Sequence, residues 1–187
     1  METRIHLLNS AEHFARSRGF DAFSYADLAA EVGIRKASIH HHFPRKADLA
    51  LALIERYRET FAEALGTIAA RAPNAGARLA GYVRAYRAAL GGGKTLCLCV
   101  AFSAGRDSLS DPVLRELAGF HEDGRAWLRE TYEKGIKDGS INGVMNPEEE
   151  SAATLALVEG AQLLARAAGS TSAFDQAVRA LTQRIKI

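Results

Sequence analysis

The chain has 187 residues, 48% of them hydrophobic and 25% charged, which excludes an intrinsically disordered protein. No run reaches the roughly 18 apolar residues that a membrane span needs. The formal net charge is only +2, and all of the excess lies in residues 1–58, which contain nine Lys or Arg and seven Asp or Glu.

The periodicity of apolar residues predicts an all-α fold of nine helices. The expected helices cover about 3–18, 24–32, 36–42, 45–71, 75–90, 95–107, 112–138, 147–169 and 173–186. Glycines mark the ends of the first two helices, at Gly19 and Gly33, and Pro44 cannot continue the third.

Helix starts carry recognisable capping patterns. Ser24 with Asp27 has the form of a capping box, and Ser172 with Asp175 is a second candidate. Asp111-Pro112 and Asn146-Pro147 each place a capping side chain before a proline in the first helical position.

Two short helices joined by a glycine turn predict a helix-turn-helix. The segment 35–46 contains Arg35, Lys36, Arg45 and Lys46 and no acid, so it forms a basic patch suited to phosphates. The alternative from these features alone is a helical hairpin of the core that does not touch DNA.

The residues of this region are more specific than the pattern. Residues 19–34 read GFDAFSYADLAAEVGI, and residues 36–49 read KASIHHHFPRKADL. Together they resemble the N-terminal signature of the TetR family of transcriptional regulators, over about residues 3–58. The resemblance implies a nine-helix fold, with a DNA-binding domain at 1–48 and a helical ligand-binding and dimerisation domain at 49–187.

The resemblance also implies roles by position. The short helix at 36–42 would enter the major groove, where Lys and Ser side chains can bond to base edges. The other candidates would contact phosphates or bases around it. The DNA-binding candidates are Ser24, Tyr25, Arg35, Lys36, Ala37, Ser38, His40, His41, His42 and Lys46.

Two of these positions depart from the family pattern. His40 stands where the family usually has tyrosine, and Arg35 stands where it has serine or threonine, so an N-cap oxygen is lost and a cation gained.

The run His40-His41-His42 also invites a metal interpretation. Successive helical residues point about 100° apart, so the three rings do not converge on one ion, and no metal is expected.

The C-terminal domain of this family dimerises and holds a small-molecule ligand. The dimer candidates are Val158, Gly160, Ala161, Leu164, Ala165 and Ala168, and the alternative is that they pack only within the monomer. The ligand-pocket candidates are Tyr82, Tyr86, Cys97, Cys99, Phe102, Phe120 and Trp127. The expectation is only that some of them line a cavity, and the alternative for each is ordinary core.

Cys97 and Cys99 lie in an apolar stretch that resembles electrophile-responsive members of the family. Only Lys94 provides a nearby cation, so the sequence does not indicate an activated thiol, and buried inert cysteines are the favoured interpretation. Two cysteines are too few for a disulfide scaffold, and the first residues lack the apolar segment of a signal peptide. We expect a cytoplasmic protein with no membrane partner.

An enzyme is the competing class. The polar cluster His121-Glu122-Asp123 is its best candidate, but sequence neighbours diverge around a helix and do not form a catalytic site. No phosphate loop, metal motif or nucleophile elbow is present, so no cofactor is expected. The resemblance implies instead a homodimeric repressor that a small molecule releases from a palindromic double-stranded DNA operator. A DNA-binding activator or architectural protein would have the same DNA-binding helix-turn-helix.

Overall fold

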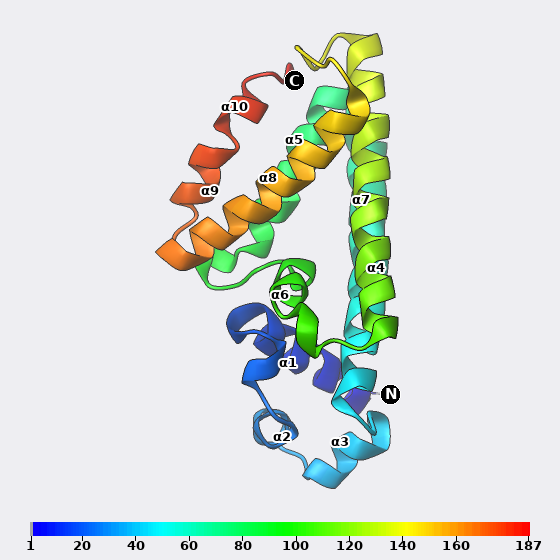
Figure 1. Cartoon of the computed structure of the whole chain (residues 1–187), viewed down its shortest axis with the longest axis vertical. Helices are drawn as coiled ribbons and strands as arrows, with labels where there is room; N and C mark the ends of the chain where they lie inside the picture. The colour runs from blue at the N-terminus through cyan, green and yellow to red at the C-terminus, as the bar shows by residue number, and fades with distance from the viewer. Residues whose placement is uncertain (1) are drawn as a thin grey trace. The chain divides into compact units, whose positions relative to one another are not determined.

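The computed structural model describes residues 2–187 and is all-α within them, as predicted (Figure 1). The α-helices are α1 (Glu2–Arg18), α2 (Tyr25–Val32), α3 (Lys36–His42), α4 (Lys46–Arg71), α5 (Ala75–Ala89), α6 (Leu98–Ala104), α7 (Asp111–Asp138), α8 (Pro147–Ala168), α9 (Ser172–Ala177) and α10 (Arg179–Thr182). Three short 3₁₀ segments join them: η1 (Phe20–Ala22), η2 (Gly91–Gly93) and η3 (Arg106–Ser108). No helix of the described chain combines the length and apolar character needed to cross a membrane.

The last predicted helix is two helices, and its expected capping box is wrong. Helix α9 has Thr171 at its N-cap with no side-chain capping bond, so Ser172 does not cap it. The carboxylate of Asp175 is bound by Arg87 of α5, with an Nε···Oδ1 distance of 2.6 Å. The helical pattern then breaks at Val178. The predicted asparagine cap of α8 is confirmed, because the Asn146 side chain accepts from the backbone of Glu148.

The described chain divides into two compact units. Unit 1 comprises the residues up to Thr60 together with Leu98–Ala118, and unit 2 comprises Phe61–Cys97 and Gly119–Ile187. In unit 1, α1 packs against α2, η1 and α6. The α1–α4 contact is reinforced by Arg56, which donates to both Asn9 and Glu12.

Unit 2 is built around α5 and α8, which lie side by side (Figure 1). Its core is apolar and includes Leu79, Val83 and Val158. The Tyr132 hydroxyl is buried and bonds to Thr154 at 2.5 Å, which ties α7 to α8. Buried polar groups normally need such a partner, so this pair fixes the register of the two helices.

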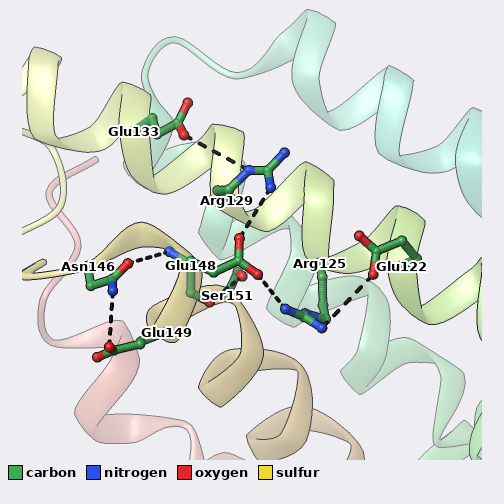
Figure 2. Close-up of polar contacts among 8 residues, drawn as sticks. All are labelled: Glu122, Arg125, Arg129, Glu133, Asn146, Glu148, Glu149 and Ser151. Carbon is green, nitrogen blue, oxygen red and sulfur yellow. Dashed lines mark hydrogen bonds and ion pairs between the residues drawn. The ribbon is translucent and has the colours of Figure 1, made fainter.

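The first turn of α8 is also fastened to α7 by charge. Glu148 receives hydrogen bonds from both Arg125 and Arg129, while Asn146 caps the helix and donates to Glu149 (Figure 2). These bonds from the two arginines lower the pKa of the Glu148 carboxyl. A carboxylate in a first turn also complements the positive end of the helix dipole.

A glycine turn packs tightly against the end of α8. Gly93 has φ +93°, and a Cβ atom there would lie 2.6 Å from the carbonyl carbon of Gly169 and 2.5 Å from the nitrogen of Ser170. Only glycine combines this backbone conformation with so close an approach. The glycine segment Gly91–Gly93 therefore makes a fixed contact between η2 and the end of α8.

Candidate nucleic-acid interface

Helix α2 begins with the capping box that the sequence predicts. The Ser24 hydroxyl accepts from the backbone of Ala26 and Asp27, and the Asp27 carboxylate accepts from the Ser24 backbone at 2.7 Å. The Ser24 bonds lower the pKa of Asp27. The helix ends at Gly33, whose φ of +73° gives the left-handed turn into α3.

Helix α3 has one fully buried side chain, and most of its others are exposed. Ile39 has no exposed surface, while Arg35, Lys36 and Ser38 are exposed. Arg35 occupies the N-cap but makes no capping bond with its side chain, as expected from the loss of a hydroxyl there. A helix anchored at one point by an apolar residue and polar elsewhere has the form of a recognition helix.

The basic patch is smaller than the sequence suggests. Arg45 pairs with Asp48 of α4 at 2.6 Å, so that cation is already compensated. Asp48 lies two residues beyond the acid-free segment, and its carboxylate also accepts from the Arg45 backbone. Arg35 and Lys36 have no partner within residues 2–187 and are the free cations of the patch.

The Lys46 ammonium is directed into the protein. It donates to the backbone carbonyls of Phe20 at 2.7 Å and Phe23 at 2.5 Å, and it lies 4.7 Å from the centroid of each ring. Partial burial lowers its pKa. Lys46 therefore fastens the start of α4 to the turn that precedes α2.

Tyr25 is also engaged inside unit 1. Its hydroxyl donates to the Phe43 carbonyl at 2.9 Å, and its ring meets that of His40 edge-on at 4.9 Å. Burial, aided by the negative charge of Asp48, raises the pKa of Tyr25 to about 12. The tyrosine supports the end of α3 from within.

The remaining DNA-binding candidates lie on or beside α3. Ala37, His40 and His41 are exposed, and His42 is half-buried with its ring 5.5 Å from that of His41. In the described part of the chain no group of three or more His, Cys, Asp or Glu side chains is placed to hold a metal ion.

The seven ligand-pocket candidates divide between the two units. Cys99 and Phe102 belong to unit 1, where Phe102 packs on Phe20 with ring centroids 5.2 Å apart. The other five, all in unit 2, are Tyr82, Tyr86, Cys97, Phe120 and Trp127. Both cysteines are buried, and neither forms a disulfide within residues 2–187.

Four of the five unit 2 candidates join one aromatic cluster. Trp127 stacks on Tyr82 at 5.5 Å, and Tyr82 contacts Tyr86 at 5.0 Å. Phe61 completes the cluster by contacting Tyr86 and Phe120. Burial strongly raises the pKa of Tyr86, so its hydroxyl stays neutral.

Sequence reasoning missed two polar features beside this cluster. His121 Nε2 lies 3.3 Å from Glu159 Oε1, and Glu159 raises the pKa of the imidazole. Gln162 is fully buried and bonds to the backbone at Tyr86 and Cys97. Neither has a local signal, because each joins residues dozens of positions apart.

The dimer candidates on α8 also divide. Val158, Ala161 and Ala165 are buried in the core of unit 2. Gly160 is half-exposed, and Leu164 is 61% exposed. Ala168 and the unpredicted Leu163 are exposed too, so the outward face of α8 is small and apolar.

Comparison with known sequences agrees with this arrangement. Residues 7–53 match the family described as "Bacterial regulatory proteins, tetR family", and residues 75–181 match "Tetracyclin repressor-like, C-terminal domain". The second match covers more than half of the chain. The chain belongs to the TetR family of transcriptional regulators, and α2–α3 is its DNA-binding helix-turn-helix.

Individual relatives give the same result. A TetR-family regulator from Agrobacterium tumefaciens is 28% identical, with a TM-score of 0.93 over 100% of this chain and 98% of that one. One from Legionella pneumophila is 28% identical, with a TM-score of 0.85 over 97% and 96%. The HTH-type transcriptional regulator TtgR of Pseudomonas putida is 36% identical over 59 residues, which are 32% of this chain and only 28% of that relative.

Proposed function

We propose that this regulator is a homodimeric repressor that a small-molecule effector releases from a palindromic operator. The observation that carries the DNA-binding part is α3, which Ile39 anchors while Arg35, Lys36 and Ser38 remain exposed. Lysine and arginine donors suit guanine edges and phosphates, and serine suits either. In this proposal residues 1–48 bind DNA, and residues 49–187 dimerise and bind the effector.

The proposed contacts differ in kind. Lys36, Ala37, Ser38 and His41 face bases from α3, with His42 beside them. Ser24, Tyr25, Arg35 and His40 serve phosphates, although the Tyr25 hydroxyl already has a protein partner. For Lys46 we propose that the two carbonyl bonds position α2, with any phosphate contact secondary. Apart from Lys46, and from Arg35, for which the sequence leaves phosphate and base contacts open, these roles are the ones expected from the sequence.

Dimerisation is supported by the outward face of α8. Gly160 lies in mid-helix, where glycine is less stable than alanine by about 1 kcal/mol, and a Cβ there would meet nothing within 4 Å. Nothing within residues 2–187 therefore requires this glycine. Close approach of a second helix would require it, and Leu163, Leu164 and Ala168 lie exposed beside it. A dimer supplies two recognition helices, one for each half-site of a palindromic operator.

Effector response is supported by the aromatic cluster and by the continuity of α4. Residues Lys46–Thr60 of α4 belong to unit 1, and Phe61 begins its unit 2 portion. We propose that an effector bound beside the unit 2 aromatics shifts the population toward a conformer in which α4 misplaces α3. An activator would use the same reading head but would raise transcription.

The test is binding of purified protein to the DNA flanking its own gene, over a series of salt concentrations. Sequence-specific, salt-sensitive binding that Lys36→Ala weakens would support the proposal. Equal affinity for flanking and unrelated DNA would contradict it. A reporter gene behind the bound sequence then separates repression from activation.

A further inference from the structure

The chain passes from unit 2 into unit 1 at the peptide bond between Cys97 and Leu98. Leu98 is also the first residue of α6. The last residue of unit 2 is therefore the direct covalent attachment of α6. Whatever fixes Cys97 in unit 2 fixes the point at which α6 begins.

One buried side chain fixes Cys97. Gln162 of α8 has no exposed surface. Its Oε1 accepts from the Cys97 backbone N–H at 2.8 Å, and its Nε2 donates to the Tyr86 carbonyl of α5 at 2.6 Å. A buried amide with both ends bonded to backbone is costly to disturb, because each lost bond leaves a buried group unsatisfied.

Tyr86 joins this bond to the aromatic cluster. Its ring contacts Phe61 at 5.7 Å and Tyr82 at 5.0 Å. The carbonyl of Tyr86 itself accepts from Gln162, so one amide links the cluster to the backbone of Cys97. All of these residues belong to unit 2.

On the other side of the peptide bond, α6 belongs to unit 1, which contains the helix-turn-helix. It packs against α1, and the buried Phe102 contacts Phe20 at 5.2 Å. Phe20 supplies one of the two carbonyls that hold Lys46. The start of α6 thus follows directly on a residue bonded to α8, while its body supports the turn before α2.

We propose that Gln162 is a positioning residue for regulation, which couples the aromatic cluster of unit 2 to α6 and hence to DNA affinity. The inference rests on the proposed effector response. It adds the specific group through which that response leaves unit 2, and it requires both amide bonds.

The experiment compares Gln162→Leu with Thr154→Val. The first change removes both bonds at nearly constant volume, and the second removes the buried Tyr132–Thr154 bond elsewhere on α8. Hydrogen exchange of the amides from Cys97 to Ala104, melting temperature and operator affinity are measured for each. We expect similar melting temperatures, at least about tenfold faster exchange in Gln162→Leu alone, and at least about fivefold weaker operator binding in that variant, within the usual range of coupling.

A third variant guards against simple loss of folding. Burial favours the neutral form of a carboxyl, so Gln162→Glu is expected to retain an acceptor and a donor at about pH 5.5 and to lose the donor at about pH 8. Its exchange relative to wild type should rise between these two values. Equal exchange of Cys97–Ala104 in Gln162→Leu and Thr154→Val would overturn the inference. If the wild type binds no operator, the proposed function fails on the affinity measurement, while the exchange measurement still decides the role of Gln162.

Discussion

Replacing Lys46 with methionine separates two roles that one lysine could have. Methionine keeps most of the apolar stem but removes both hydrogen bonds to the Phe20 and Phe23 carbonyls. Hydrogen bonds to charged groups contribute about 1.5–3 kcal/mol each. Because the ammonium is only partly buried, solvent reduces this contribution, and we expect a loss of about 2 kcal/mol in the free energy of unfolding. For a chain of this size the melting temperature should fall by about 4–8 °C.

The assay pairs thermal unfolding with DNA affinity at several salt concentrations. A lysine that contacts phosphate contributes about 0.9 to the slope of log affinity against log salt, whereas a positioning lysine contributes nothing. We expect Lys46→Met to bind more weakly with an unchanged slope. Lys36→Met is the matched control, since Lys36 is exposed and should affect affinity without affecting the melting temperature. An unchanged melting temperature in Lys46→Met, together with a slope lower by about one, would show that Lys46 contacts phosphate and does not hold the turn before α2.

Three further predictions concern unit 2. Gly93→Ala should lower the free energy of unfolding by about 2–4 kcal/mol in chemical denaturation, because it combines a strained φ with a backbone clash, whereas Gly92→Ala, which has open space, should lose about 1 kcal/mol. The pKa of His121 is raised above 6.5 in the folded state, so its stabilising contribution is complete below that value and is lost as the pH rises beyond it. Glu159→Gln should flatten this part of the plot of melting temperature against pH, and an unaltered plot would argue against the pair. Leu164→Glu places a charge on the proposed dimer surface of α8 and should give a monomer in sedimentation velocity. A dimer that persists in this variant would show that α8 does not form the interface.

The helix-turn-helix was predictable because its signals are local. Ser24 and Asp27 are three residues apart, and Gly33 lies where the chain must adopt positive φ. Capping and turn chemistry of this kind act within a few residues, so sequence spacing specifies them. The local pattern was misleading at Ser172. The Asp175 carboxylate that it assigned to capping is bound by Arg87, which is far away in the sequence.

The orientation of charged and apolar side chains was less predictable. The sequence places Lys46 in a basic patch, but the carbonyls that bind it belong to a turn more than twenty residues earlier. Helix α8 carries small or apolar side chains around much of its circumference. The spacing of apolar residues therefore did not distinguish its buried face, with Val158 and Ala165, from its exposed face, with Leu163. Tertiary packing decides both cases.

Selection of bound sequences from a random double-stranded DNA library tests whether a dimer of this protein reads its operator through α3. We predict an enriched palindrome whose half-sites lie about one helical turn, or a multiple of it, apart. Lys36→Ala should relax the preference at one base step in each half-site. Recovery of no enriched sequence, or of an unpaired single site that Lys36→Ala leaves unaltered, would contradict a dimer that reads its operator through α3.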